Sequence, residues 1–334
     1  MEQAWLAGKS LLLSAGLEIN TVDLIIGQKN KINPDQELEI ITKNKIDITT
    51  IKDNNYPKLL KEIYCPPPLL YHYGQINLSQ DYTLAVVGSR KYSEYGRQVT
   101  FDLIRSLSSA GMVIISGLAL GIDTFAHQAA VEQNGKTIAV VGSGLDLIYP
   151  SSNRQLAEKI IATGGAIISE FPPGTPPYKS NFPQRNKTIS GLSLGTLIIE
   201  ANIKSGALIT AQYALEQNRE IFTVPGNIYQ ATSAGCHKLI KDGAKLVTAP
   251  TDILEALNLE KIADYKTSQA ILPENETEKI ILEIITAEPT HVDKIAQASR
   301  LNISVINATL ALMEMKGSIK NLGSQKYIKS RWKY

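Results

Sequence analysis

The segment YKSNFPQRNK, residues 178–187, concentrates side-chain types that bind nucleic acids in other proteins. Among its aromatic rings, cations and amides are Tyr178, Lys179, Asn181, Phe182, Arg185, Asn186 and Lys187. Because cations neutralise phosphates and aromatic rings stack on bases, this composition fits a single-stranded nucleic acid. In the alternative interpretation Phe182 packs into the core and the cations are merely solvated, and composition alone leaves both open. We expect the segment to lie on a long, proline-stiffened loop.

A second candidate is the turn Gly88-Ser89-Arg90, which lies between an apolar run and a helical pattern. This order is that of a phosphate-binding strand–loop–helix, in which backbone N–H groups and a hydroxyl face an anion. A dinucleotide fingerprint has three glycines, whereas this turn has one and adds an arginine. The glycine could equally serve only to permit a tight turn. Because other polar, glycine-containing loops follow the neighbouring apolar runs, we favour a phosphate-binding rim, with Gly88, Ser89 and Arg90 contacting the ligand.

The acidic and imidazole side chains do not indicate a reaction class. Asp123 and His127 would share one helix face as a metal or acid–base pair, but we expect a helix cap or a core hydrogen bond instead. Glu170 and Glu200 end apolar runs, where each could be a general base or could anchor a neighbouring loop. The sequence has no nucleophile elbow, Walker loop, HExxH motif or zinc-ligand spacing. The residues by themselves therefore indicate no reaction class, and they show no motif for a metal or cofactor.

Alternating apolar runs and helical patterns between residues 83 and 258 must position these side chains. The expected strands are Thr83–Gly88, Met112–Ser116, Thr137–Gly142, Ala166–Glu170, Thr196–Glu200, Ile221–Val224 and Lys245–Val247. Nearly continuous apolar runs of this kind predict strands that are buried on both faces of a parallel sheet. The expected fold class is therefore α/β, an extended Rossmann-like, doubly wound and mostly parallel sheet. Ligands of such sheets bind at the carboxyl ends of the strands, where the polar loops lie.

Two smaller modules are expected on either side of this region. Residues 1–55 carry leucine and isoleucine at helical spacing and predict a small helical module, ahead of the sheet domain at 56–260. Residues 261–274 have the composition of a linker. Three helical patterns and two alternating runs around a Gly-Ser pair then predict a winged helix-turn-helix at 275–334, with Ser304 as an N-cap.

The overall composition narrows the class of protein further. The chain has 334 residues, a net charge of +2 and 43% hydrophobic residues, so it resembles an ordinary globular protein and any basic surface must be local. Its two cysteines, Cys65 and Cys236, fit free thiols in a reducing compartment. No apolar stretch reaches the ~18 residues that a membrane-spanning helix needs. We expect a cytoplasmic protein with no membrane partner.

Taken together, the motifs resemble the DprA family, DNA-processing protein A, also called Smf. The matching stretches run in order from VVGSR through SGLALGIDTFAH, GKTIAVVGSGLDLIYPSSN, SEFPPG, NFPQRNKTISGLS and IIEANIKSGALITAQYALEQNREIFTVPG to GCHKLIKDGA. One such motif would mean little, whereas the ordered series, over residues 56–257, is specific. The resemblance implies a non-catalytic protein that binds and protects single-stranded DNA, loads the RecA recombinase in natural transformation, and works as a homodimer.

The resemblance also implies particular contact residues. The family's DNA-contacting positions are matched here by Arg90, Lys179, Phe182, Arg185 and Asn186. Lys187 stands where an arginine is frequent, which keeps the charge but loses the bidentate fork. Ser151 replaces a lysine that some members carry after the YP pair, a contact that only Arg154 could restore. The family's self-association surface maps to His237 and Leu246.

Two other classes of protein remain as alternatives. A nucleotide hydrolase of the phosphoribohydrolase type would use a similar rim with Glu170 or Glu200 as base, but this sequence lacks a PGGxGT-like loop. A winged-helix transcription regulator with a ligand-sensing α/β domain would bind a specific duplex more tightly than a single strand. Within the expected winged helix, the stretch SVINATLALMEMKG is so apolar that we favour a protein-contact module over a sequence-specific reader.

Overall fold

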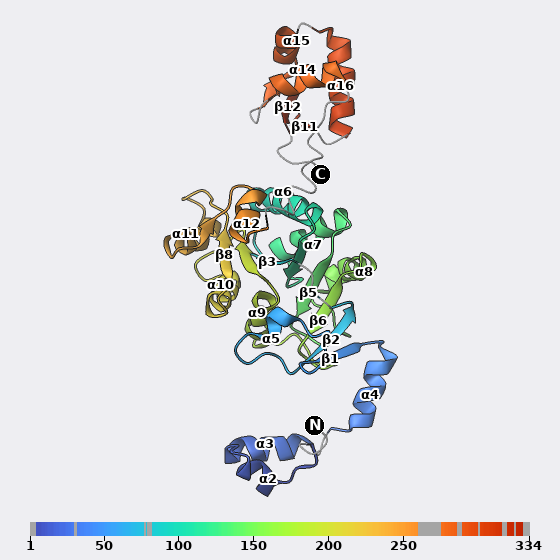
Figure 1. The fold of residues 1–334 in the computed structure, drawn as a ribbon, viewed down its shortest axis with the longest axis vertical. Coiled ribbons are helices and arrows are strands. Elements are labelled where there is room, and N and C mark those ends of the chain that lie inside the picture. Colours follow the sequence, from blue (N-terminus) through green and yellow to red (C-terminus); the bar gives the residue numbers. More distant parts are fainter. Residues whose placement is uncertain are drawn as a thin grey trace. The chain divides into compact units, whose positions relative to one another are not determined.

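The computed structural model of the chain describes residues 5–29, 32–76, 78, 82–259, 275–285, 289–299, 301–315, 319–323 and 325–329 (Figure 1). The chain divides into two compact units, Met1–Ile48 and Thr49–Tyr334. The first unit contains helices α2 (Lys9–Ser14), α3 (Ile19–Lys29) and α4 (Pro34–Lys43). Helix α4 begins with a proline directly after its N-cap, Asn33, whose side chain accepts hydrogen bonds from the N–H groups of Asp35 and Gln36.

A nine-stranded sheet with the order β1-β2-β6-β5-β4-β3-β7-β8-β9 forms the centre of the largest domain. Its strands are β1 (Asp47–Thr50), β2 (Leu69–Gly74), β3 (Thr83–Val87), β4 (Val113–Ser116), β5 (Thr137–Val141), β6 (Ala166–Ser169), β7 (Gly195–Ile198), β8 (Glu220–Thr223) and β9 (Lys245–Leu246). The strands from β6 through β3 to β9 pair in parallel, and β2 is antiparallel to β6. Every residue of β3 to β7 is buried, as the apolar runs predicted. The predicted mostly parallel, Rossmann-like sheet is confirmed.

Helices cover both faces of this sheet. They are α5 (Lys58–Lys61), α6 (Glu94–Ser109), α7 (Ile122–Glu132), α8 (Arg154–Ala162), α9 (Asn181–Gly191), α10 (Gly206–Glu216), α11 (Ala234–Lys241) and α12 (Pro250–Ala256), with short 3₁₀ turns η1 (Ser151–Asn153) and η2 (Ala231–Ser233). Leu84 and Val86 of β3 pack with α6, α7 and α12, whereas Ala85 and Val87 pack with α5, α9, α10 and α11. This alternation follows from the period of two of a strand, and it gives the domain two apolar cores. Among the described residues, no helix is both long enough and apolar enough to span a membrane.

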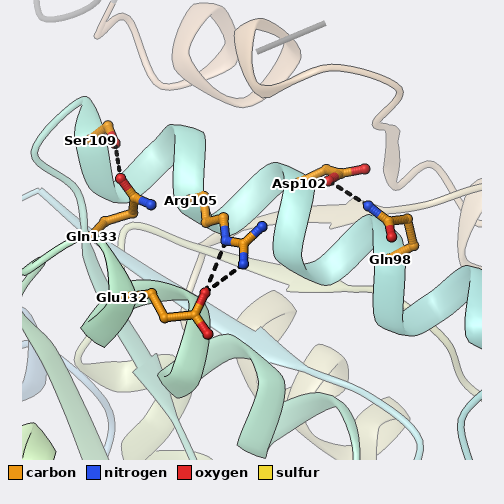
Figure 2. A network of polar contacts seen from close by, with 6 residues as sticks. All are labelled: Gln98, Asp102, Arg105, Ser109, Glu132 and Gln133. Atoms are coloured by element: carbon orange, nitrogen blue, oxygen red, sulfur yellow. Dashed lines mark hydrogen bonds and ion pairs between the residues drawn. The ribbon is translucent and has the colours of Figure 1, made fainter. Parts of the chain in front are cut away.

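Helices α6 and α7 lie side by side and are joined by polar contacts on their outer surface (Figure 2). Arg105 of α6 binds one carboxylate oxygen of Glu132 of α7 through Nε at 3.1 Å and Nη2 at 2.5 Å. Nearer the end of α6, the Ser109 hydroxyl donates to the Gln133 side chain at 3.2 Å. These contacts join α6 and α7, the helices that follow β3 and β4.

Several elements of this domain were not predicted from the sequence. Strand β1 lies within residues 1–55, for which a helical module was expected, and helix α5 and strand β2 lie in residues 56–82, for which no helix or strand was expected. Helix α9 begins at Asn181, so the prediction that residues 178–187 form a loop was wrong from that residue onward. Pro183 is compatible with this helix because it lies in the first turn, where backbone N–H groups have no intrahelical acceptor.

The C-terminal part is a winged helix, as predicted. Its helices are α14 (Glu276–Ile284), α15 (Val292–Ser299) and α16 (Ile303–Met315), and its strands β10 (Thr290–His291), β11 (Ile319–Asn321) and β12 (Lys326–Lys329) form an antiparallel sheet. Ser304 is not the N-cap that the sequence suggested, because its own N–H donates at 2.9 Å to the side chain of Asn302, which caps α16 instead. The expected linker, residues 261–274, lies outside the described residues.

Candidate nucleic-acid interface

The loops after β3, β4, β5 and β6 meet at one edge of the sheet, because parallel strands place their carboxyl ends together. With the start of α9 they surround a hollow of ≈ 40 Å³. It is lined by Arg90, Gly117, Ala119, Leu120, Gly142, Ser143, Tyr149, Pro150, Pro177, Phe182 and Arg185. The fold therefore brings together the two candidate segments of the sequence, the turn 88–90 and the segment 178–187.

Arg90 is the exposed cation of this hollow. Its guanidinium carbon lies 5.4 Å from the ring centroid of the half-buried Phe182. The Phe182 ring in turn lies 6.1 Å from the ring of Tyr149, which is 48% exposed. An arginine over an aromatic face is held by a cation–π interaction, yet its outward N–H groups stay available to a phosphate. The two rings offer apolar surface for a base beside that charge.

Arg185 differs from Arg90 because it is 4% exposed and lies behind the Phe182 ring, 5.8 Å from the ring centroid. Its Nη1 donates to the carbonyl oxygen of Val140 at 2.7 Å and also to that of Gly117. Burial lowers the pKa of Arg185 to about 10, while the nearby Asp123 carboxylate opposes that fall, so the side chain remains a cation at neutral pH. Arg185 therefore ties α9 to the ends of β4 and β5 and adds a buried positive charge under the hollow.

Asp123 and His127 belong to the support of this hollow. The Asp123 carboxylate accepts a hydrogen bond from the Gly117 N–H at 3.1 Å, and burial raises its pKa although the Arg185 charge opposes the rise. The hydroxyl of Thr137 donates to Ile114, so it accepts from Nδ1 of His127 at 2.8 Å. Both residues thus make core hydrogen bonds, as the sequence suggested. Within the described ranges, no group of three or more His, Cys, Asp or Glu could hold a metal ion.

The turn 88–90 and Asn181 are held by internal contacts. The Ser89 hydroxyl donates to the Lys91 carbonyl at 2.6 Å and accepts from the Lys91 N–H at 3.1 Å, so its proton is already engaged. Gly88 lies so close to Ile122 that a Cβ would stand 2.7 Å from its Cγ1. The buried Asn181 amide donates to Gly142 at 3.0 Å and fixes the first turn of α9. These residues shape the hollow, and Arg90 is the group they present to solvent.

The remaining candidates of the segment 178–187 do not all face the hollow. Lys179 is exposed and makes no ion pair with any described residue. Asn186 donates to the Gly206 carbonyl at 3.3 Å, at the start of α10. Lys187 donates to the Cys65 carbonyl at 3.0 Å. Lys187 lies two positions after Arg185, about 200° around the helix, so it leaves the side of α9 that carries Phe182 and Arg185. Asn186 follows Phe182 by one turn, and its hydrogen bond directs its amide to α10.

Glu200 and Glu170 both anchor neighbouring elements. The Glu200 carboxylate accepts from the Ser93 N–H at 2.9 Å and from the Ser93 hydroxyl at 2.6 Å, at the N-terminus of α6, and it is 1% exposed. It also accepts from the Thr232 hydroxyl at 3.2 Å. Glu170 accepts from the Gln184 amide at 3.0 Å and from the Thr188 hydroxyl, both on α9. Both carboxylates therefore hold helices in place at the sheet edge.

The other residues singled out in the sequence are not among those that line the hollow. Arg154 is exposed at the start of α8 and lies 3.8 Å from Glu158, and Ser151 begins η1. Leu246 is 47% exposed on β9, the edge strand of the sheet, and the His237 imidazole is 3.0 Å from the Gly226 carbonyl oxygen.

Tyr149, Leu120 and Pro177 line the hollow but were not singled out in the sequence. All three lie in loops that follow expected strands, so the rule that ligands bind at strand carboxyl ends was the available signal. Residue type gave no further indication, because isolated apolar residues in loops are common.

The fold and this hollow define a Rossmann-like α/β domain with a cation–aromatic surface at the carboxyl edge of its sheet, followed by a winged helix. Residues 47–258 match the model of the DNA recombination-mediator protein A family, and residues 266–324 match the DprA winged helix domain. The chain belongs to this family of DNA-processing recombination mediators.

Individual relatives agree with that assignment. Protein Smf of Synechocystis sp. is 36% identical over 98% of this chain and 91% of its own length. The crystal structure of DNA processing protein A from Streptococcus pneumoniae is 42% identical, with a TM-score of 0.65 over 70% of this chain and 81% of that one. A structure of DNA processing protein A from Helicobacter pylori, described for its single-stranded DNA binding mode, is 30% identical, with a TM-score of 0.57 over 64% of this chain and 97% of that one.

Proposed function

We propose that this chain binds single-stranded DNA at the carboxyl edge of its sheet, with Arg90, Lys179 and Phe182 as the principal contacts. The observation that carries the proposal is the Arg90 guanidinium over the Phe182 ring at 5.4 Å, beside the Tyr149 ring. A phosphate needs the charge and a base needs the rings, so one nucleotide can use both. The Helicobacter pylori relative, described as binding single-stranded DNA, supports the same ligand.

The other candidate residues take supporting roles in this proposal. Gly88 and Ser89 form the turn that presents Arg90, and Asn181 and Arg185 hold α9 so that the Phe182 ring faces the hollow. Asn186 and Lys187 contact neighbouring segments, and they would reach a strand only where it leaves the hollow.

The test compares an oligo(dT) strand with a duplex of equal length across a salt titration. The wild type should prefer the single strand, and Arg90→Ala/Lys179→Ala should reduce the slope of log K against log salt by about 1.4, from two lost phosphate contacts. Lys58→Ala/Lys159→Ala removes two exposed charges near the opposite edge of the sheet and should leave the slope unchanged. A duplex preference, or equal slopes for both double variants, would contradict the proposal.

Phe182 provides a second measurement that separates stacking from charge. Phe182→Ala should weaken oligo(dT) binding by about 1–3 kcal/mol without changing the salt slope, because stacking involves no counterion release. Phe182→Tyr keeps the ring and should retain most of the affinity.

We propose further that the chain acts by binding and not by catalysis. Glu170 and Glu200, the two candidate bases of a hydrolase, each accept hydrogen bonds from the helices that they anchor. A general base must reach the substrate, and neither carboxylate lines the hollow. Incubation with a panel of nucleoside monophosphates and analysis of released base by chromatography should show no turnover above a blank.

The family resemblance supports a homodimer and the RecA recombinase as partner, which would place the protein in the cytoplasm. Leu246, half-exposed on the edge strand β9, and His237 near it are the proposed contact residues. Leu246→Glu should halve the mass measured by light scattering. The Leu246→Glu protein should still bind single-stranded DNA at the Arg90 hollow when the protein concentration is high. The reason is that this hollow is formed by the loops after other β-strands than β9. Wild type should also accelerate RecA filament formation on a coated single strand.

The winged helix at 275–334, which follows the sheet domain at 56–260 and the linker at 261–274 in the sequence, is proposed as an accessory, protein-contact domain. The described residues of α16 and its N-cap, 301–315, include no lysine or arginine, and Val305 and Leu312 on α16 are 45% and 53% exposed. A helix that reads duplex DNA would need cations or amides on that face. Val305→Lys/Leu312→Lys should therefore leave the affinity of the full chain for single-stranded DNA unchanged, apart from any added non-specific charge effect that high salt removes.

A further inference from the structure

We infer that the bound strand continues past Arg90 across the ends of β7 and β8, where a further nucleotide binds between Tyr95 and the turn 225–230, against Tyr229 and Lys204. This inference rests on the proposed function and extends its footprint to the other half of the sheet edge. The strand order makes the two halves continuous, because β7 lies next to β3 and β8 lies next to β7. Two strand spacings of about 4.8 Å put this second region about 10 Å from the turn that carries Arg90.

A second hollow lies in this region, separate from the one under Arg90. It measures ≈ 470 Å³ and is lined by Tyr95, Pro225, Gly226, Asn227 and Gln230. The volume is in the range of small-molecule sites, so it can hold a base with its sugar. One wall is the ring of Tyr95, which is 44% exposed, and the opposite wall offers amide groups that can bond to base edges.

The turn that forms this hollow is held firmly. The Tyr95 hydroxyl donates to the Pro225 carbonyl at 2.7 Å, which ties the turn to the start of α6. The Asn227 side chain accepts from the Tyr229 N–H at 2.9 Å, and the Gln230 N–H donates to the Asn227 carbonyl at 3.0 Å. A turn with its own hydrogen bonds keeps its side chains in one place, so their exposure reflects a built surface.

The side chains that this turn presents are unusually exposed for their type. Tyr229 is 90% exposed and Ile228 beside it is 75% exposed. A partner that covers the exposed ring removes apolar surface from water, which favours binding. A nucleobase has a flat face that matches such a ring. The observations therefore indicate a ligand that is flat and apolar on one face.

The charges of this region favour a nucleic acid strand over a protein surface. Lys91 and Lys204 are exposed, and neither forms an ion pair with the described residues. The acid Glu94 lies 3.4 Å from Arg97, and Glu200 is buried in the anchor described above. Cations interleaved with aromatic rings along one edge are what a phosphodiester strand with stacked bases requires. Continuity with the Arg90 hollow makes the occupant the same strand.

The experiment measures affinity against strand length, with oligo(dT) from about 4 to 16 nucleotides, the span of known single-strand site sizes. For the shortest oligo(dT) strands with measurable binding, Tyr229→Ala should have the same affinity as wild type. It should bind strands that reach β8 about 5- to 150-fold more weakly. Tyr229→Phe should behave as wild type, and Lys204→Ala should lower the salt slope by about 0.7 for the long strands only.

The controls separate this inference from the proposed function. Arg90→Ala should weaken binding at every length, so a wild type that does not bind oligo(dT), or an Arg90→Ala protein that binds as wild type, refutes the proposed function. If Arg90→Ala weakens binding but Tyr229→Ala matches wild type at all lengths, only the further inference is overturned. Loss of dimer mass in light scattering with unchanged DNA affinity would assign Tyr229 to a protein contact and would also overturn it.

Discussion

Substitution of the two arginines next to the Phe182 ring should change two different properties, the stability of the fold for Arg185 and DNA binding for Arg90. Arg185 is 4% exposed and donates to two backbone carbonyls, whereas Arg90 is exposed. Arg185→Met keeps most of the side-chain volume but leaves the Gly117 and Val140 carbonyls without their donor and the buried Asp123 without its nearest positive charge. Arg185→Met should therefore reduce stability, and Arg90→Ala should reduce DNA binding.

The expected size of the stability loss follows from these contacts. Removing one member of a buried, hydrogen-bonded charged group costs about 3–5 kcal/mol, because the partners stay buried and unpaired. Arg90→Ala exposes no such group and should change the free energy of unfolding by less than about 0.5 kcal/mol. With urea m-values of about 2–3 kcal/mol/M for a domain of this size, Arg185→Met should lower the midpoint by about 1–2.5 M.

Urea unfolding followed by far-UV circular dichroism provides the measurement. Because Asp123 is part of the same buried group, Asp123→Asn/Arg185→Met should be less destabilised than the sum of its single variants, by about 0.5–3 kcal/mol. An Arg185→Met protein within 1 kcal/mol of wild type, roughly the cost of an ordinary substitution, would refute the structural role of Arg185. Strict additivity of the double variant would refute its coupling to Asp123.

Three further predictions concern the support of the site. Burial, with the Arg185 charge adding to it, lowers the pKa of His127 to about 3, so the unfolded chain takes up a proton below pH 6.5 and the folded chain does not. The free energy of unfolding should therefore fall as pH falls from 6.5 towards 3, by up to about 1.4 kcal/mol per pH unit. His127→Gln should flatten this slope, and a slope unchanged by His127→Gln contradicts the assignment. Gly117→Ala places a Cβ 2.7 Å from the Asp123 carboxylate and against Nη1 of Arg185, so it should lower both the urea midpoint and the DNA affinity, whereas Gly206→Ala, where a Cβ meets open space, should not lower the DNA affinity. Glu200→Gln points its side-chain NH₂ group at either the Ser93 N–H or the Ser93 hydroxyl, so it should lower the free energy of unfolding by about 1–3 kcal/mol. An unchanged urea midpoint would show that the contact of Glu200 with α6 contributes nothing to stability.

The sheet could be predicted from the sequence because its strands are buried on both faces. The run Thr83–Val87 does not alternate between apolar and polar residues as a half-exposed strand would, and glycine and polar residues follow it. Strand β2 was missed because it is antiparallel and only partly buried, and its residues include His72 and two tyrosines. Helix α9 was missed because its first turn contains a proline and its inward side is polar, with Arg185 and Thr188 buried.

The difference between Arg90 and Arg185 could not be predicted from residue type. Both are arginines in motifs of the same family, and both lie within 6 Å of one ring. Which of them is buried depends on Gly117, whose missing side chain leaves room for the guanidinium, and on Asp123. Those residues lie 68 and 62 positions before Arg185 and come close to it only when β4, α7 and α9 are assembled.

The same assembly explains why the candidate site lies where it does on the sheet edge. In a dinucleotide-binding fold the anion binds at the N-terminus of the helix after the first strand, in the crevice where the strand order reverses. Here that crevice lies between β3 and β7, and the chain's own Glu200 carboxylate binds the N-terminus of α6 there. Gly96 has no side chain because a Cβ would collide with that carboxylate. With the helix N-terminus already paired to an internal anion, a phosphate gains more from the exposed Arg90 than from backbone N–H groups. An arginine on the open edge can bind any phosphate of a phosphodiester backbone that passes it, whereas a closed crevice cannot accommodate a passing strand. An exposed arginine therefore suits a ligand that crosses the sheet edge.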